Sequence, residues 1–359
     1  MSNFDLLINK IPNEDLWQYL KASKLPIVLY GMGDGADKII SVLKSYDIKI
    51  SDIFASDEFV RGHSFQGFKV KKYSEICSNY DKANILLCFA AHTVELYNRF
   101  DEISAKFNFF APDVPVTGEG LFTLDYFNFY KNEIKTAYES LEDESSKKVF
   151  ENIILYKLTG KIQYLKSADS DKESAFCDIL KLSSDENFLD LGAYNGDTVK
   201  EFTEVTNSSY NQILAVEPDL RSYNKLQNYL NTVVNARALN CGISNIDTEL
   251  MFSNKAGRMS AIGQKKGVLT KIYKIDTLCK SEKFVPTYIK MDLEGEEEAA
   301  LNGAVDTLQT KPKLLVSAYH RTQDLFSLIN LIHTINKNYK IYLRKHSYIP
   351  AWDINIYAI

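Results

Sequence analysis

The sequence predicts an α/β protein with two open parallel sheets, each flanked by helices. Two observations support this fold class. A short apolar run followed by a glycine-rich turn and a helical pattern occurs twice, beginning at Ile27 and at Asn187. From residue 187 to about residue 340, apolar strand-like runs also alternate with helical patterns, as expected for a doubly wound parallel sheet.

Composition limits the function classes. The chain has 359 residues and 45% hydrophobic residues, enough for two domains or a little more. Its net charge of −5 argues against nucleic acid as a main partner, because phosphate binding needs a basic face. The five cysteines form no C-x-x-C pair, which disfavours structural zinc and a disulfide framework. The first twelve residues do not resemble a signal peptide, and no apolar run reaches about 18 residues, so we expect a cytoplasmic protein without a membrane span.

Changes in pattern divide the chain into four parts. The expected parts are a helical extension (1–24), a small Rossmann-like unit (25–115), a helical connector (116–186) and a larger α/β domain (187–359). Aromatic residues in the connector recur at helical spacing, which favours core packing over a lid.

The small unit has strands predicted at 27–30, 48–54 and 85–89. The first strand meets Gly31, Gly33 and Ala36, a G-x-G-x-x-A turn, and Asp57 follows the second strand, where it could bind a ribose hydroxyl. The pattern leaves open whether this is a ligand site or an ordinary turn. The unit resembles the nucleotide-sugar-handling amino-terminal domain of some bacterial sugar acyltransferases, which implies a nucleotide or sugar as its ligand.

The larger domain has a regular series of predicted elements. We expect strands at 187–191, 212–216, 233–239, 288–291, 314–318, 340–344 and 354–359, a helix at 220–230, and a small antiparallel insertion at 249–252 and 269–273.

The first glycine-rich turn of this domain is the strongest candidate for a cofactor site. Its glycines permit positive φ and let a ligand lie against bare backbone. Asp190 ends the strand and Asp197 opens the next helix, so two carboxylates flank the turn. They would repel a pyrophosphate and suit a cationic cofactor with an amino-acid end, such as S-adenosylmethionine. The turn residues in this set are Asp190, Gly192, Ala193, Tyr194, Gly196 and Asp197.

Polar residues at the ends of the next two strands complete the set. Glu217, with Asp219 close behind it, lies about 20 residues beyond the turn, where an acid accepts hydrogen bonds from ribose hydroxyls. Asn240 ends the third strand. The alternative is a Rossmann-like turn with ordinary capping residues.

Five carboxylates crowd residues 292–298. Asp292 and Glu294 follow a strand directly, at the edge where the transferred group should lie. Their repulsion can be relieved by a sulfonium, by Lys290 or by a divalent metal with oxygen ligands. We favour metal least, because no second ligand group of clear spacing accompanies them.

A hydroxyl acceptor must lose its proton during methyl transfer. His320, after the strand at 314–318, is placed to titrate near neutral pH at the mouth of the sheet. His320, Asp292 and Glu294 are therefore the candidate catalytic residues.

Residues 187–359 resemble the FkbM-type methyltransferases. The resemblance rests on five segments in order: 190–197, 217–219, 275–278, 289–296 and 301–304. It implies O-methylation by S-adenosylmethionine, with acceptors that are often sugars of bacterial surface polysaccharides or natural products. The family commonly has Glu-Gly-Ala-Glu, whereas here Glu296 replaces the alanine and Glu297 matches the second acid.

The expected function is thus O-methylation of a sugar, nucleotide-sugar or glycan precursor. One alternative is an NAD(P)-dependent sugar oxidoreductase that uses the small unit, although no Tyr-x-x-x-Lys pair lies near it. Another is a cofactor-binding scaffold without catalytic activity.

Overall fold

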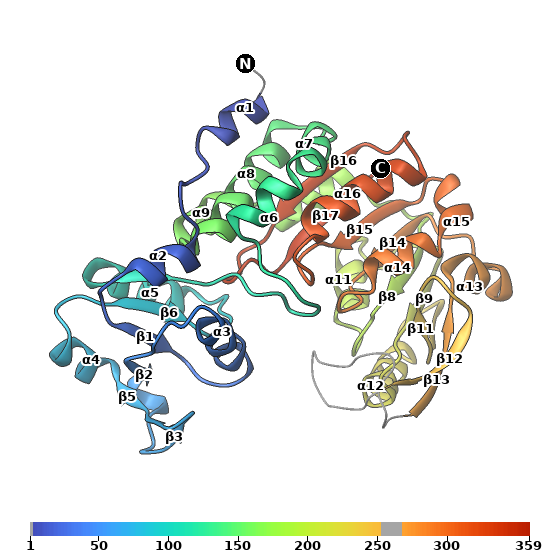
Figure 1. The fold of residues 1–359 in the computed structure, drawn as a ribbon. Coiled ribbons are helices and arrows are strands. Elements are labelled where there is room, and N and C mark those ends of the chain that lie inside the picture. The colour runs from blue at the N-terminus through green and yellow to red at the C-terminus, as the bar shows by residue number, and fades with distance from the viewer. Residues whose placement is uncertain (1–2, 253–267) are drawn as a thin grey trace.

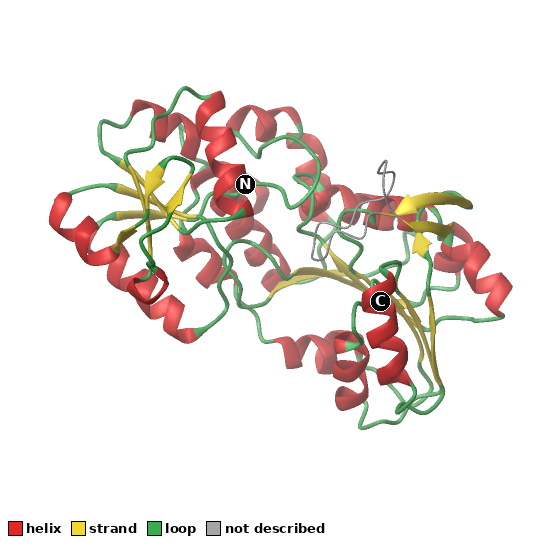
Figure 2. Ribbon diagram, turned by 90° about the horizontal axis from the view of Figure 1, so that it is seen from below, coloured by secondary structure: helices red, strands yellow, loops and turns green. Residues whose placement is uncertain are grey.

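Two α/β units dominate the structure, a computed structural model that describes residues 3–252 and 268–359. Figure 1 places the first unit at the left and the second at the right, with the green connecting helices above and between them. Figure 2 shows helices on both faces of each sheet. The central strands of both sheets are buried except at Asn187, because helices cover these parallel strands on both faces.

The first unit contains a five-stranded parallel sheet in the order β5-β2-β1-β6-β7. Its strands are β1 (Ile27–Tyr30), β2 (Asp52–Ala55), β5 (Lys71–Lys72), β6 (Asn84–Leu87) and β7 (Asn108–Phe110). Its helices are α3 (Asp34–Ser45), η1 (Asp57–Phe59), α4 (Tyr73–Asn79) and α5 (Val94–Lys106), and β3 (Ser64–Phe65) with β4 (Phe68–Lys69) forms a small hairpin.

The predicted strand at 48–54 begins later than expected. Residues 48–51 are the approach to β2, with the Ile48 N–H bonded to the carbonyl of Leu43 in the preceding helix. The three-residue strand β7 was not predicted, because so short an apolar segment carries no period of its own.

Helices precede the first unit and link it to the second. They are α1 (Asn3–Ile8), α2 (Leu16–Ala22), α6 (Leu124–Phe129), α7 (Lys131–Glu139), α8 (Glu144–Thr159), α9 (Ile162–Ala168), α10 (Lys172–Ser174) and the π-helical turn η2 (Ala175–Leu180). Helix α8 covers an outer strand, β16 (Ile341–Lys345): Ser146 Oγ accepts from the Leu343 N–H at 2.9 Å, and Arg344 donates to Asp143 at 2.6 Å. Among the helices of the described ranges, none is both long and apolar enough to cross a bilayer.

The second unit is built on a seven-stranded sheet in the order β10-β9-β8-β14-β15-β17-β16. Besides β16, its strands are β8 (Asn187–Leu191), β9 (Gln212–Val216), β10 (Ala236–Leu239), β14 (Tyr288–Met291), β15 (Lys313–Ser317) and β17 (Ile354–Ala358). Its helices are α11 (Asp197–Val205), α12 (Leu220–Leu230), α13 (Ile275–Glu282), α14 (Glu297–Asn302), α15 (Val305–Gln309) and α16 (Asp324–Ile335). Strand β17 lies antiparallel between β15 and β16, and these two strands confirm those predicted at 354–359 and 340–344.

The predicted insertion is a small separate sheet. Strands β12 (Thr248–Phe252) and β13 (Val268–Tyr273) pair antiparallel as expected, and β11 (Gly242–Ile243) adds to β13 in parallel. Strand β10 starts three residues later than predicted, since Asn235 has a φ of 54° and ends the preceding turn.

In both large sheets, a glycine packs against a backbone carbonyl of the neighbouring segment at the point where the strand order reverses. In the second sheet this point lies between β8 and β14, where ligands of open α/β sheets bind. Gly192 follows β8 with a φ of 80°, and a Cβ there would lie 1.9 Å from the carbonyl oxygen of Asp292, which follows β14. In the first sheet the same reversal lies between β1 and β6, and a Cβ on Gly35 would lie 2.3 Å from the carbonyl oxygen of Cys88. Only glycine allows the two backbone segments to approach each other so closely in each sheet.

The first unit also holds a loop of the second. At the end of β6, Ala91 exchanges two backbone hydrogen bonds with Ile349, at 2.7 and 2.8 Å. The ring of His92 stacks on Tyr348, with centroids 5.3 Å apart. The loop 346–353, which joins β16 to β17, is therefore fixed from outside its own sheet.

Replacing Gly192 with alanine tests the close approach at the switch point. Gly33→Ala is the matched control, because Gly33 has a similar φ of 94° but no atom within 4 Å of its Cβ position. We expect Gly33→Ala to cost about 1 kcal/mol through positive φ alone, and Gly192→Ala to cost about 3 kcal/mol because a backbone clash is added. Thermal and urea unfolding measure both; equal losses would contradict the packing described here.

Candidate active site

Asp190 and Lys290 form a buried charge pair under the glycine-rich turn. Asp190 is fully buried in β8, and its carboxylate accepts a hydrogen bond from Thr198 Oγ1 and lies 3.5 Å from Lys290 Nζ. Lys290 also donates to the Gly192 carbonyl at 3.1 Å. Burial raises the pKa of Asp190 and would lower that of Lys290, whose pKa nevertheless rises because Asp190 and Asp292 lie nearby. Asp190 therefore stabilises the turn through its two partners, because Thr198 lies just after the turn and Lys290 binds the Gly192 carbonyl within it.

Glu217 ties the glycine-rich turn to the end of β9. Its buried carboxylate accepts from the backbone N–H groups of Tyr194 and Asp219, each at 2.8 Å. Asn240 donates to the Glu217 carbonyl at 2.9 Å, so the end of β10 joins the same cluster. Burial raises the pKa of Glu217 to about 7, since the two backbone donors only partly offset desolvation.

The remaining turn residues differ in exposure. Ala193 is buried, and the N–H groups of Gly192 and Ala193 both donate to the Val216 carbonyl at 3.0 Å. Tyr194, with a φ of 46°, and Asp197 project toward solvent. Gly196 precedes α11 with a φ of 94°, and Asp219 caps α12. The structure thus brings the predicted cofactor residues to one edge of the sheet.

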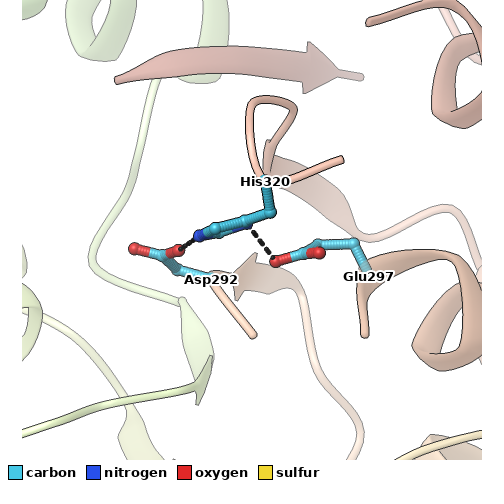
Figure 3. Close-up of side chains that lie close together, drawn as sticks. All are labelled: Asp292, Glu297 and His320. Atoms are coloured by element: carbon cyan, nitrogen blue, oxygen red, sulfur yellow. Dashed lines mark ion pairs between the residues drawn. The ribbon is translucent and has the colours of Figure 1, made fainter. Parts of the chain in front are cut away.

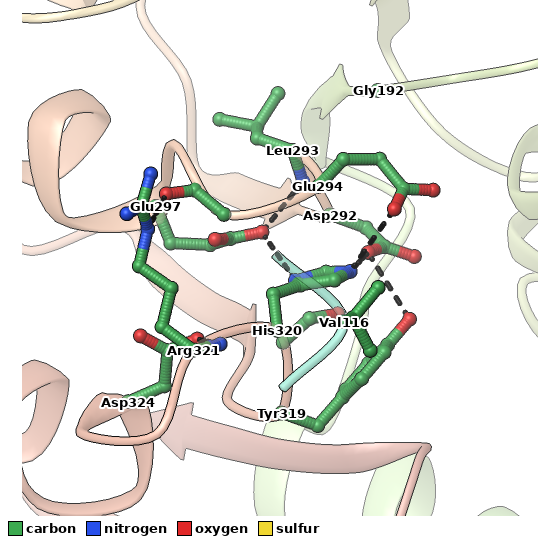
Figure 4. Close-up of polar contacts among 12 residues, drawn as sticks. Val116, Gly192, Asp292, Leu293, Glu294, Glu297, Tyr319, His320, Arg321 and Asp324 are labelled. Atoms are coloured by element: carbon green, nitrogen blue, oxygen red, sulfur yellow. Dashed lines mark hydrogen bonds and ion pairs between the residues drawn. The ribbon is translucent and has the colours of Figure 1, made fainter. Parts of the chain in front are cut away.

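His320 lies between two carboxylates beneath this edge. Its ring is fully buried, with Nε2 3.3 Å from Asp292 Oδ1 and Nδ1 2.9 Å from Glu297 Oε1 (Figure 3). Glu294 Oε2 approaches Nε2 at 3.7 Å from the exposed side (Figure 4). Glu297 is also fully buried and accepts from the Leu293 N–H at 2.7 Å, which fixes the loop that carries Asp292 and Glu294.

This arrangement changes the role expected of His320. Burial alone would lower its pKa, but Glu297, Asp292 and Glu294 raise it to about 9. Burial would raise the pKa of Asp292, yet Lys290 and His320 hold it below its usual value. At neutral pH His320 is therefore a cation that keeps Asp292 ionised, and an imidazolium cannot accept a proton from a substrate. Asp292 and Glu294, both about one-third exposed, remain the candidate proton acceptors.

Asp292, Glu297 and His320 also offer atoms within 4.8 Å of one another, close enough to consider a metal ion. Figure 3, however, shows the imidazole ring between the carboxylates, with each nitrogen facing a different one. An ion bound to one nitrogen would be separated by the ring from the carboxylate at the other. The geometry fits an imidazolium between two carboxylates better than a single-ion site.

A segment of the connector covers His320. The Thr117 N–H donates to the His320 carbonyl at 3.0 Å, and Val116 lies beside the ring in Figure 4. Arg321 donates to the Gly295 carbonyl at 2.6 Å, and Thr322 donates to the Gly120 carbonyl at 3.0 Å. These contacts keep water from the ring, so its ion pairs act in a low-dielectric setting.

Two residues of this cluster were not among the sequence candidates. Tyr319 donates to Asp292 Oδ1 at 3.4 Å, although a tyrosine after a strand carries no distinctive signal. Glu297, in the first turn of α14, was named only as the match to the family's second acid.

The candidate residues of the first unit lie apart from this cluster in the sequence and on another sheet. Gly31 and Gly33 follow β1, and Ala36 is buried in α3. Asp57 already accepts from the Tyr73 N–H at 2.9 Å. Asp34 and Asp37 occupy the first turn of α3, where they would repel a phosphate from the helix N-terminus.

Comparison with known proteins identifies the second unit. Residues 190–348 match the family model of the methyltransferase FkbM domain. This part of the chain belongs to the FkbM-type methyltransferases. No curated protein sequence matches the chain.

A solved structure is similar to this chain over its full length. The crystal structure of methyltransferase FkbM from Methylobacillus flagellatus KT is 20% identical, with a TM-score of 0.73, and the match covers 100% of this chain and 94% of that one. At this identity the likeness shows the fold, and it confirms the predicted α/β architecture. Aeropyrum pernix fibrillarin, solved with S-adenosyl-L-methionine, matches 52% of this chain and 73% of its own at 12% identity; its TM-score of 0.34 is too low to support an argument.

The charged state of His320 predicts a pH-dependent stability. Its folded pKa of about 9 exceeds the ordinary value of 6.5, so its stabilisation is complete below about pH 6.5 and is lost as the pH rises through about 9. We expect His320→Gln to lose about 3 kcal/mol at neutral pH, because Glu297 remains buried without a cation, and to lack this alkaline decline. Unfolding midpoints between about pH 6 and pH 10 test this.

Two further variants control this experiment. Glu297→Gln added to His320→Gln should recover part of the lost stability, because the buried charge is then removed. His63→Gln, at an exposed histidine, should behave like the unmodified protein. An unchanged alkaline decline in His320→Gln would overturn the ion-pair assignment.

Proposed function

We propose that this FkbM-type methyltransferase moves a methyl group from S-adenosylmethionine to a hydroxyl of a sugar, nucleotide sugar or glycan precursor. One observation carries the proposal: Asp292 is held as a carboxylate by Lys290 and His320 directly beside the Gly192 turn. A fixed anion at the switch point suits both a cationic cofactor and a hydroxyl that must lose a proton.

The turn fits the cofactor through its bare backbone and through the carboxylates around it. A Cβ at Gly192 would overlap the Asp292 carbonyl oxygen, so glycine lets the turn pack against Asp292 and presents bare backbone to a ligand. Each Glu217 oxygen accepts one backbone N–H and retains capacity for a ribose hydroxyl. Asp197 and Asp292 add negative charge around it. When bound, S-adenosylmethionine supplies a methyl group on a positively charged sulfur.

The residues of this chain contribute orientation and proton transfer. The Asp292 carboxylate accepts a hydrogen bond from the acceptor hydroxyl and takes its proton as the oxygen–carbon bond forms; Glu294 can relay that proton to solvent. Because the pKa of Asp292 is low, positioning contributes more to rate than basicity does. His320 and Lys290 hold the carboxylate in place and are positioning residues.

We also propose the division into an extension (1–24), a first unit (25–115), a connector (116–186) and a methyltransferase domain (187–359), acting in the cytoplasm with no nucleic-acid partner. No observation favours the oxidoreductase alternative, since acids line the first turn of α3. A scaffold without activity predicts cofactor binding and no methylated product from any acceptor extract.

Cofactor affinity should depend on the protonation of Glu217. Its pKa of about 7 means that the free protein loses stability as the pH rises from about 4.5 through 7, while the carboxylate that binds a ribose becomes populated. We expect S-adenosylmethionine to bind about tenfold more tightly at pH 8 than at pH 6, and Glu217→Gln to bind weakly without pH dependence. Titration calorimetry measures both; equal affinities of the two proteins would refute the ribose contact.

Asp292→Asn should separate binding from turnover. We expect S-adenosylmethionine affinity to change less than about twofold and S-adenosylhomocysteine formation, with nucleotide sugars and cell-derived glycans as acceptors, to fall about 100-fold or more. Loss of affinity with unchanged turnover would place Asp292 at the cofactor instead.

Exhaustive chelation tests the metal alternative. We expect full S-adenosylhomocysteine formation after treatment with EDTA, because His320 lies between its two carboxylates as an ion-pair partner. Activity that disappears with EDTA and returns with Mg²⁺ or Mn²⁺ would show that a divalent cation takes part.

A further inference from the structure

A cavity of about 210 Å³ extends along one face of the methyltransferase sheet, from Tyr288 at the start of β14 to Asp292 just beyond its end. Of the residues predicted from the sequence, only Asp292 lines it; the glycine-rich turn and Glu217 do not. Asp292 therefore stands between the proposed cofactor turn and this cavity. The volume is small beside the ~300–1,000 Å³ of sites that enclose a whole small molecule, so the cavity suits one ring of a larger acceptor.

Aromatic rings form the part of the wall that belongs to the loop 346–353. Tyr348 and Trp352 both line the cavity and stack on each other, with ring centroids 5.6 Å apart and an interplanar angle of 29°. Tyr319 lines it as well, next to Asp292. Rings of this kind pack against the C–H faces of a pyranose while its hydroxyls remain available for hydrogen bonds.

Most charged groups in the wall have a charged or hydrogen-bonding partner. Lys172 is paired with Glu201 at 2.6 Å, and the ammonium of Lys290 with Asp190. Asp353 accepts from the amide of Asn355 at 2.7 Å. With Asp292 added, the wall carries slightly more negative than positive charge. A phosphate or carboxylate would be repelled, whereas an uncharged polyol finds donors and acceptors among these groups.

The first unit fixes the aromatic wall. Ala91 pairs with Ile349 through two backbone hydrogen bonds, and His92 stacks on Tyr348. His92, Tyr348 and Trp352 thus form a row of stacked rings that runs from the end of β6 to the cavity. A loop held in this way presents a preorganised surface to a ligand.

We propose that this cavity is the acceptor subsite, that it receives one uncharged, hydroxyl-rich pyranose ring against Trp352, whose other face rests on Tyr348, and that it directs a ring hydroxyl to Asp292. The inference rests on the proposed methyl transfer to a sugar and adds the charge class of the ring and the residues that select it. Any phosphate or nucleotide of the acceptor then lies outside the cavity.

Binding of simple glycosides tests this without turnover. The probes are methyl pyranosides, compared with glucose 6-phosphate and glucuronate as anionic rings, in the presence of S-adenosylhomocysteine. Saturation-transfer NMR reports contact, and the fluorescence of Trp352 gives the affinity, since the second tryptophan, Trp17, is buried in α2 where this helix packs on the first unit. We expect at least one neutral pyranoside to bind about tenfold more tightly than its anionic counterparts.

Substitutions of Trp352 test whether pyranosides bind in this cavity. Trp352→Ala should weaken pyranoside binding about tenfold, as seen by NMR, whereas Trp352→Phe should retain most of it and S-adenosylmethionine affinity should be unchanged in both. Phe129→Ala is the matched control, an aromatic residue that is 78% exposed on the connector. Unfolding midpoints show whether each variant is folded; if Trp352→Ala is unstable, Trp352→Phe and Tyr348→Phe carry the comparison.

Three results would overturn the proposal. They are tighter binding of the anionic rings, weaker S-adenosylmethionine binding by Trp352→Ala with unchanged pyranoside binding, and no pyranoside binding by the folded protein. If pyranosides bind as expected but no acceptor yields S-adenosylhomocysteine, the subsite stands and the proposed methyl transfer fails.

Discussion

The buried ammonium of Lys290 is the charge on which the site depends. It neutralises Asp190 below the glycine-rich turn, donates a hydrogen bond to the Gly192 carbonyl and lowers the pKa of Asp292, which follows the same strand as Lys290. A lysine in the centre of a sheet loses nearly all of its hydration, so only carboxylates placed around it make that position tolerable. The Asp190–Lys290 ion pair therefore joins β8 to β14, and the same ammonium keeps Asp292 ionised at the end of β14.

His320 is a second buried cation that is stabilised by surrounding carboxylates. Its ring balances Asp292 and Glu297, and the connector segment around Val116 excludes water from it. Two cations and several carboxylates thus form one continuous network under the switch point, and the network leaves Asp292 and Glu294 as its partly exposed anions. Catalysis in such a site relies on groups whose charges and positions are set before a ligand arrives.

Much of the methyltransferase sheet could be predicted from the sequence. The runs at 187–191 and 288–291 could be recognised as buried strands because they are mostly apolar, although each holds one buried charged residue, Asp190 or Lys290. The bounds of α12 were predicted to the residue. Asp190, Gly192 and Glu217 could be placed together because parallel strands end at a common edge. Strand β7 and the late start of β10 could not be predicted, since a three-residue strand and the positive φ of Asn235 leave no periodic pattern.

The roles of side chains were harder to predict than their positions. A histidine after a strand suggests a base, but the charge of His320 depends on Glu297, whose carboxylate comes from a different element. The cavity could not be predicted for the same reason. Tyr348 and Trp352 are remote in sequence from Asp292, and their loop is held by Ala91 of the first unit. Contacts between distant segments carry no local signal.

The backbone bridge between Ala91 and Ile349 has a consequence for how such a chain can diversify. Replacements in the first unit can shift the rim of the cavity while the cofactor edge, built from β8 and β9, stays untouched. If the cavity is the acceptor subsite proposed above, substitutions in the first unit would change which acceptors the second unit binds, and exchange of whole amino-terminal units between related chains would transfer that selectivity.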